Sequence, residues 1–178
     1  MLLLIGASAS GKTEISKIII KKYGFNKMIT YTTRDKRVGE VDGVDYYFLS
    51  KDKFLKKQKE DYFLETTFYN NNYYGTAFKD ADKKKVLIVD VNGANKIFEY
   101  MQDEVVIFLL EATEQIREER MRLRGDTKEQ INARLDNDRT YFIEENINHI
   151  DYVIDTTPYS LEELADKIYH LYINHIND

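Results

Sequence analysis

The stretch MLLLIGASASGKT, residues 1–13, decides the fold class. Its continuous apolar run at 1–5 is typical of a strand buried inside a parallel sheet. Over residues 12–23 the apolar positions take helical spacing, with isoleucines on one face and charged residues on the other. Between them, residues 6–13 fit the pattern G-x-x-x-x-G-K-[ST] in full. The sequence therefore predicts a strand, a phosphate loop and a helix in direct succession.

Each part of this loop favours the binding of a nucleotide phosphate. Gly6 and Gly11 let the backbone curl so that successive N–H groups converge on an anion, and the next helix points its positive end there. Lys12 reaches the outer phosphates, and the Thr13 hydroxyl ligates Mg²⁺. The alternative is a Gly/Ser turn beside a surface lysine. The predicted ATP-binding residues are Gly6, Ala7, Ser8, Ala9, Ser10, Gly11, Lys12 and Thr13.

Strands and helices alternate along the rest of the chain, which predicts an α/β fold with helices on both faces of a parallel sheet. Residues 30–80 break this rhythm, and their many Tyr, Phe and Thr residues indicate a small antiparallel insertion. Further core strands are expected at 86–90, 105–110 and 152–155. Helices are expected at 51–60, 93–101, 113–123, 127–147 and 160–173. Within the insertion, side chains expected to pack are Val38, Val41, Val44 and Tyr47.

The composition fits one globular domain and narrows the classes of partner. With 178 residues, 43% of them hydrophobic, the chain can form a core and is too apolar for a disordered protein. A net charge of −5 gives no general attraction to nucleic acid or an anionic membrane, so an anion site must be a local basic cluster. Without cysteine there is no disulfide or thiolate metal site. The first apolar run is too short for a signal peptide or membrane span, and we expect a cytoplasmic protein.

Asp90 closes the apolar run VLIVD at 86–90. It therefore lies at the carboxyl end of a core strand, where ligands bind in open α/β sheets. There it could orient Mg²⁺ through water or contact a substrate; the alternative is a residue that only begins the next helix. These residues imply a Mg²⁺-dependent purine-nucleotide site for phosphoryl transfer or hydrolysis, with the acceptor still open.

Three further motifs, in a fixed order along the chain, indicate the identity of the acceptor. They are TTRDKRVGEVDGVDYYF at 32–48, ETTFYNNNYYGT at 65–76 and VLIVDVNG at 86–93. Following a phosphate loop, they resemble the guanylate kinase family, and the resemblance extends from that loop to about residue 135. It implies a P-loop NTPase with a three-layer α/β/α core. The implied divisions are a core at 1–30, 81–116 and 134–178, an insertion that binds the nucleoside monophosphate at about 31–80, and a helical lid at about 117–133.

The resemblance implies roles for the residues of the acceptor site. Arg34 and Arg37 would grip the acceptor phosphate, because guanidinium groups give fixed, charge-assisted forks to phosphate oxygens. Glu65 would accept from N1 and N2 of guanine, a donor pair that adenine does not present. Glu40 would orient the two arginines. The implied GMP-binding residues are Thr30, Arg34, Arg37, Glu40, Tyr46, Glu65, Tyr74, Gly75, Thr76 and Asp90.

A basic patch, REERMRLRGDTKEQINARL at 117–135, resembles the lid of this family, whose arginines fold over the ATP phosphates. Arginines there would stabilise charge on the transferring phosphoryl group. The alternative is an exposed helix with Glu–Arg pairs at i,i+4 spacing. The implied catalytic residues are Lys12, Arg34, Arg120, Arg124 and Arg134.

The implied activity is the transfer of phosphate from ATP to GMP or dGMP. Mg²⁺ is the implied cofactor, bound directly by Thr13 and through water by Asp90. The expected partners are ATP and GMP, with no nucleic acid or membrane, for a monomer or homodimer. Two alternatives remain, namely a kinase of another phosphorylated acceptor and a non-catalytic guanylate-kinase-like interaction domain. The segment DTTPYSL at 155–161 departs from the family pattern Asn-Asp-Asp-Leu near adenine, which leaves the strictness toward the donor open.

Overall fold

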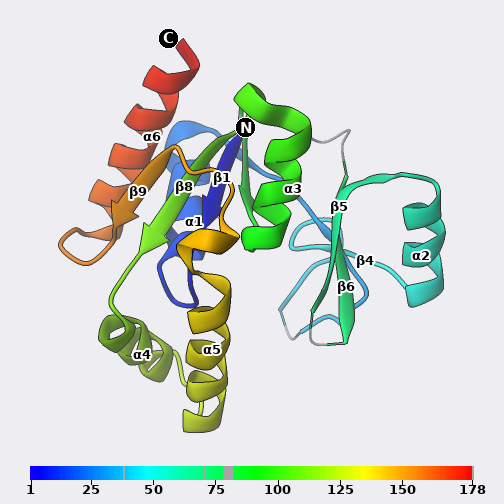
Figure 1. The fold of residues 1–178 in the computed structure, drawn as a ribbon, viewed down its shortest axis with the longest axis horizontal. Coiled ribbons are helices and arrows are strands. Elements are labelled where there is room, and N and C mark those ends of the chain that lie inside the picture. Colours follow the sequence, from blue (N-terminus) through cyan, green and yellow to red (C-terminus); the bar gives the residue numbers. More distant parts are fainter. Residues whose placement is uncertain (38, 70, 78–81, 178) are drawn as a thin grey trace.

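The computed structural model describes residues 1–37, 39–69, 71–77 and 82–177. Two sheets organise this part of the chain, a five-stranded one in the order β2-β7-β1-β8-β9 and a four-stranded one in the order β4-β3-β6-β5. The first lies on the left of Figure 1 and the second on the right. Two helices, α4 and α5, extend below the first sheet in the same view.

All pairs in the five-stranded sheet are parallel, so the carboxyl ends of its strands meet at one edge. Its strands are β1 (Leu2–Ile5), β2 (Asn26–Lys27), β7 (Lys85–Ile88), β8 (Val106–Glu111) and β9 (Tyr152–Asp155). Side chains of β1 alternate between two separate cores, with Leu2 and Leu4 in one and Leu3 and Ile5 in the other. Burial on both faces explains why this run of sequence is continuously apolar.

Helices cover both faces of this sheet, which confirms the predicted α/β fold. One face packs against α1 (Lys12–Tyr23) and α6 (Leu161–Asn177), and the other against α3 (Val91–Met101). Ile15 and Ile19 bring α1 onto the first face, as their helical spacing predicts. A 3₁₀ turn, η2 (Gln102–Glu104), leads from α3 into β8.

The second sheet contains β3 (Tyr31–Thr32), β4 (Tyr47–Phe48), β5 (Phe63–Tyr69) and β6 (Asn72–Ala77), and α2 (Lys51–Lys59) packs against it. Strand β6 is antiparallel to both β3 and β5, as predicted, whereas β3 and β4 pair in parallel. The core beside α2 is aromatic, and Phe54 stacks on Phe63 with ring centroids 4.5 Å apart. Lys96 of α3 donates to the carbonyl of Thr66 at 3.2 Å and so joins this sheet to the parallel one.

Helices α4 (Glu114–Leu123) and α5 (Lys128–Tyr141) form a hairpin, which we call the lid hairpin. Its interior is a small core of Met121, Ile131 and Leu135. The helix predicted at 127–147 is too long, because Phe142 leaves the helix and packs into the core beside α3. A separate 3₁₀ turn, η3 (Glu144–Asn146), follows.

The expectations for the valines of the insertion and for one domain boundary have different outcomes. Val41 and Val44 are 54% and 58% exposed, so they do not pack, because both lie in a turn rather than on a strand. Tyr47 does pack, with its ring stacked on Tyr31 at 4.7 Å. Val38 and the expected boundary between insertion and core at 80/81 lie outside the described residues. Within those residues, no helix has both the length and the apolarity to cross a membrane.

Candidate active site

A cleft of about 450 Å³ lies at the carboxyl edge of the parallel sheet, where it meets the second sheet and the lid hairpin. It brings together most of the predicted site residues, which come from all three parts of the fold. Those that line it are Gly6, Ser8, Ala9, Lys12, Thr13, Thr30, Tyr46, Glu65, Tyr74, Gly75, Thr76, Asp90, Arg124 and Arg134. The remaining predicted residues lie outside the cleft wall, namely Ala7, Ser10, Gly11, Arg34, Arg37, Glu40 and Arg120.

The side chain of Lys12 is hydrogen-bonded to the backbone of the phosphate loop itself. The Nζ atom of Lys12 donates to the carbonyls of Gly6 and Ala7, at 2.6 and 2.8 Å. Burial lowers the pKa of Lys12 from 10.5 to about 8, since the charged form is poorly solvated there. Gly6 has φ +146°, and a Cβ at this position would lie 2.3 Å from the carbonyl oxygen of Leu110. The loop therefore turns so closely past β8 that only glycine fits.

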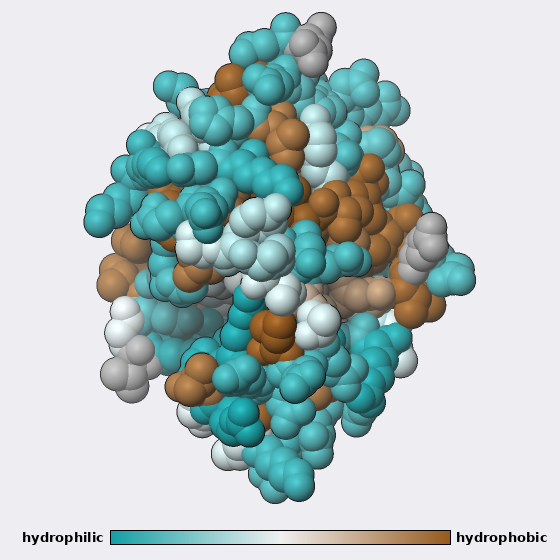
Figure 2. Space-filling view, turned by 90° about the vertical axis from the view of Figure 1, so that its left-hand side faces the viewer, coloured by the Kyte–Doolittle hydropathy of each residue, from teal (hydrophilic) through white to brown (hydrophobic). Residues whose placement is uncertain are grey.

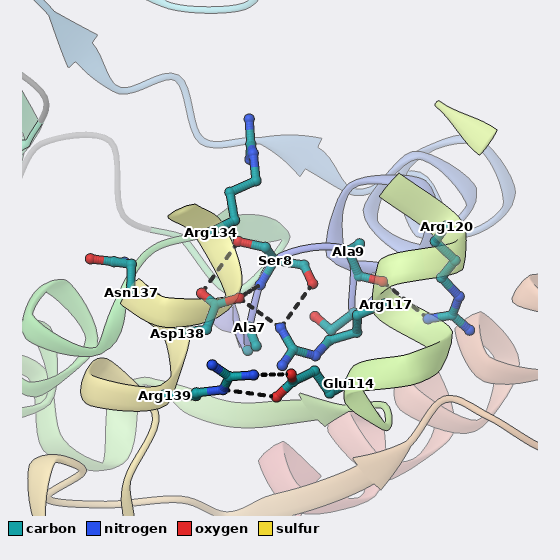
Figure 3. A network of polar contacts seen from close by, with 12 residues as sticks. Ala7, Ser8, Ala9, Glu114, Arg117, Arg120, Arg134, Asn137, Asp138 and Arg139 are labelled. Atoms are coloured by element: carbon teal, nitrogen blue, oxygen red, sulfur yellow. Dashed lines mark hydrogen bonds and ion pairs between the residues drawn. The ribbon is translucent and has the colours of Figure 1, made fainter. Parts of the chain in front are cut away.

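A buried ion pair on the lid hairpin grips Ser8 of this loop, as Figure 3 shows. Asp138 of α5 accepts from the Ser8 backbone N–H at 2.9 Å and from its hydroxyl at 3.3 Å. Arg117 of α4 donates to Asp138 at 2.6 Å and to the Ser8 carbonyl at 3.4 Å. Neither residue was predicted: Arg117 begins the basic patch at 117–135 but matches none of its implied catalytic arginines, and Asp138 lies just beyond the patch, where it looks like an ordinary charge on an exposed helix.

The three predicted lid arginines differ in what they contact. Arg120 donates to the carbonyl of Ala9 at 3.1 Å and to the carbonyl of Thr156 at 3.1 Å, so it is fixed at the base of the hairpin. Arg124 and Arg134 line the cleft, and both pair with Asp126 near the hairpin tip. In Figure 3 the side chain of Arg134 points away from the network around Ser8.

In the segment between β3 and β4, the Glu40 carboxylate joins the two predicted arginines. It accepts from the guanidinium of Arg34 at 2.7 Å and from the backbone N–H of Arg37 at 2.8 Å. The side-chain hydrogen bond raises the pKa of Arg34 and lowers the pKa of Glu40, so both stay charged at neutral pH. The guanidinium of Arg34 also lies 5.5 Å from the ring centre of Tyr46, which lines the cleft. The Arg37 side chain is exposed.

Glu65 is a buried carboxyl on the second-sheet side of the cleft, with 7% of its surface exposed. It accepts from the hydroxyl of Thr76 at 2.6 Å. Burial raises the pKa of Glu65 from 4.5 to about 7, and the charge of Asp90 adds to this increase. Thr67, two positions further along β5, also lines the cleft, although no motif position predicts it.

Asp90 is both a cleft residue and a helix cap. Its carboxylate accepts from the N–H of Gly93 at 2.7 Å and so begins α3, the role considered as the alternative. It also lines the cleft, as does Thr13 at the start of α1. Both side chains offer oxygen atoms, the ligand type that Mg²⁺ prefers. Within the described ranges, no group of three or more His, Cys, Asp or Glu could hold a metal ion. Mg²⁺ is commonly bound by only one or two protein oxygens, together with water and substrate phosphates.

A second cavity of about 460 Å³ lies on the other side of Asp138, between the end of β8 and the lid hairpin. Asp138 lines both cavities, whereas Arg117 lines only the second. Figure 2 shows the face that carries α6, β9 and α4, which is mostly hydrophilic and hollowed across its middle. The Arg117–Asp138 pair is thus part of the wall between two water-accessible spaces.

Comparisons with known proteins agree with this architecture. A family model described as guanylate kinase matches residues 1–171. The chain is 36% identical over 139 residues to a guanylate kinase of Fusobacterium nucleatum, covering 74% of this chain and 75% of that protein. It is 36% identical over 164 residues to one of Wolinella succinogenes, covering 86% and 75%. The crystal structure of a guanylate kinase from Anaplasma phagocytophilum superposes with a TM-score of 0.70 at 25% identity, covering 98% of this chain and 84% of that one.

Proposed function

The chain belongs to the guanylate kinase family, and from this membership we propose that its cleft transfers the γ-phosphate of ATP to GMP, giving ADP and GDP. The observation that supports this most directly is a single cleft lined both by Lys12 of the phosphate loop and by Glu65 of the second sheet. A loop for donor phosphates and a carboxylate for the acceptor base thus face one space. Such a site can hold two nucleotides end to end, as direct phosphoryl transfer requires.

The donor nucleotide binds along the phosphate loop in this proposal. Lys12 leaves the carbonyls of Gly6 and Ala7 and contacts the outer phosphates, while backbone N–H groups and the start of α1 hold the rest. Arg124 and Arg134, which line the cleft and pair with Asp126 of the hairpin tip, exchange Asp126 for the transferring phosphoryl group. Arg120 stays on the carbonyls of Ala9 and Thr156 and supports the loop.

The acceptor nucleotide binds against the second sheet. Arg34 and Arg37, oriented through Glu40, grip the GMP phosphate, and the hydroxyls of Tyr46 and Tyr74 donate to it. Glu65 in its charged form accepts from the N1 and N2 donors of guanine. The remaining GMP contacts proposed here come from cleft residues around the base, namely Thr30, Gly75, Thr76 and Asp90.

Mg²⁺ fits the donor end of the cleft. Thr13 would hold the ion directly and Asp90 through water, and both side chains line the cleft with oxygen atoms. When bound, the ion supplies positive charge that neutralises the phosphates of ATP.

The chain supplies position and charge rather than a general base. A dianionic phosphate on GMP is itself a competent nucleophile, so the arginines need only hold it in line with the γ-phosphate. Water must be excluded, because it would otherwise take the phosphoryl group. We expect the second sheet and the tip of the lid hairpin to close over the cleft once both nucleotides are bound.

The decisive experiment measures ADP production from ATP with GMP, dGMP, AMP, UMP and CMP as acceptors. We expect turnover with GMP and only weak turnover with the pyrimidine nucleotides and AMP. Replacing Glu65 by Gln should raise the KM for GMP strongly while leaving the KM for ATP within about two-fold, since an amide cannot accept both guanine donors. Equal turnover with AMP or UMP would overturn the guanine assignment. An absence of ADP production with every acceptor would favour an interaction domain instead.

A further inference from the structure

The Arg117–Asp138 pair is buried to a degree that stability alone does not explain. Arg117 is 7% exposed and Asp138 5% exposed, and Arg117 Nε has no hydrogen-bond partner among the described residues. Buried ion pairs can often be replaced by apolar side chains without loss of stability, because desolvation of the two charges opposes their attraction. The role of this pair should therefore be sought in what it holds.

What the pair holds is one residue of the phosphate loop. Asp138 accepts from the N–H and the hydroxyl of Ser8, and Arg117 donates to the carbonyl of Ser8. The peptide groups on both sides of Ser8 are thus fixed by side chains that lie 109 and 130 residues further along the chain. A loop of small residues would otherwise have many conformations, and each must be given up when a ligand binds.

The neighbouring residue, Ala9, is held by the same hairpin. Its side chain packs against the lid core, and its carbonyl accepts from Arg120 at 3.1 Å. Ala9 has φ +61°, a left-handed conformation that alanine rarely adopts. Contacts from the base of the lid hairpin thus keep two successive loop residues, Ser8 and Ala9, in one conformation.

We propose that Arg117 and Asp138 are positioning residues that preorganise the phosphate loop through Ser8, so that affinity for ATP depends on the base of the lid hairpin. This inference rests on the proposed function only in taking ATP as the ligand of the loop. Preorganisation raises affinity because the ordering cost is already met in the free protein. Affinity for GMP, which binds at the other end of the cleft, does not depend on the pair.

The test measures binding of a non-hydrolysable ATP analogue with Mg²⁺ by titration calorimetry, with GMP absent, and binding of GMP separately. If the pair preorganises the loop, Asp138→Asn and Arg117→Gln should both raise the Kd of the analogue by about ten-fold. This factor corresponds to the loss of one or two hydrogen bonds to Ser8. The Kd of GMP stays within about two-fold, since its site is untouched. A direct charge effect would instead act in opposite directions, because Asp138→Asn adds net positive charge near the loop and Arg117→Gln removes it.

A second ion pair, which joins the same two helices without contacting the phosphate loop, provides a matched control. Arg139 of α5 pairs with Glu114 of α4, and both side chains are exposed. Arg139→Gln therefore removes a bridge between α4 and α5 and should leave the Kd of the ATP analogue within about two-fold. An equal loss of affinity in this variant would overturn the proposal, since any loosening of the hairpin would then suffice.

Variants that keep the buried charges guard against failure to fold. Ser8→Ala removes only the hydroxyl bond to Asp138 and should weaken the ATP analogue by about two- to three-fold. Arg117→Lys keeps the charge without the forked shape and should lie between wild type and Arg117→Gln. The inference would be overturned if Asp138→Asn and Arg117→Gln changed the Kd of the analogue in opposite directions. It would also be overturned if the variants lowered the melting temperature but left this Kd unchanged. Binding of the analogue without phosphorylation of GMP would overturn the proposed function alone.

Discussion

Thr76 on β6 donates its hydroxyl to Glu65 on β5 at 2.6 Å, and the two residues face each other across an antiparallel pair. This contact supports the charged carboxylate, but burial has the larger effect and raises the pKa of Glu65 to about 7. The Glu65 carboxyl, which is proposed to bind guanine, therefore titrates close to neutral pH in the free protein.

A pH dependence of GMP recognition follows. Guanine offers two N–H donors, so only the ionised form of Glu65 can accept both. Between pH 6 and pH 8 the ionised fraction rises about ten-fold for a group with this pKa, and the KM for GMP should fall by up to that factor. Steady-state kinetics across this range at saturating ATP would measure the change. In Glu65→Gln the KM should be high and should lose most of this dependence, and a wild-type KM that stays flat would contradict the prediction.

The same carboxyl should make stability depend on pH. Its pKa is raised in the folded state, so between pH 4.5 and 7 the folded protein binds more protons at Glu65 than the unfolded chain does. The free energy of unfolding therefore falls as pH rises through this window, by at most about 3 kcal/mol. Glu65→Gln removes the effect, so its melting temperature relative to wild type should increase from pH 5 to pH 8. Parallel melting curves for the two proteins would contradict the shift.

Lys12→Met should separate activity from stability. The lysine is expected to neutralise donor phosphates, so kcat should fall by about a thousand-fold. Because the folded-state pKa of Lys12 is lowered to about 8, its charge destabilises the folded state at pH 7. The variant should therefore melt at the same temperature as wild type or higher. A large drop in melting temperature would instead make Lys12 a structural residue, and the loss of activity would then say little about catalysis.

Gly6→Ala should disrupt the protein where an ordinary glycine replacement would not. Its Cβ would lie 2.3 Å from the Leu110 carbonyl oxygen, so the loop or β8 must shift, at a cost of about 3 kcal/mol or more. Gly24 is the matched control, because it also has positive φ, +69°, but nothing lies within 4 Å of its Cβ position. Gly24→Ala should cost only about 1 kcal/mol in chemical denaturation. Equal costs for the two variants would show that backbone conformation, not the close approach to β8, limits position 6.

The elements that sequence predicts best are those whose pattern is complete within one segment. The helix α1 and the strand β9 begin and end where their apolar spacing predicts. The helix predicted at 127–147 fails for the opposite reason. Its apolar residues continue past Tyr141, but Phe142 belongs to a core contributed by distant segments, and local spacing does not report that.

The residues of the candidate site show the same difference between local patterns and contacts made by distant segments. The phosphate loop and the three motifs that follow it are each continuous in sequence, and most of the site residues predicted within them line one cleft. Arg117 and Asp138 are 21 residues apart on two helices and reach a loop near the start of the chain, so no local pattern joins them. Asp90 shows a different limit. It caps α3 and lines the cleft, so the two interpretations considered for it were not exclusive.

The second sheet leaves and rejoins the core between two strands that are themselves neighbours. Strand β2 precedes it and β7 follows it, and the two pair in parallel, Asn26 beside Lys85 and Lys27 beside Val86. The second sheet is therefore an insertion between two neighbouring strands, and its exchange for another segment that connects the same two ends would leave the strand order of the parent sheet intact. In the proposed function the insertion carries the GMP site and the parent sheet carries the phosphate loop, so a change of acceptor need not disturb the strands that support the donor site.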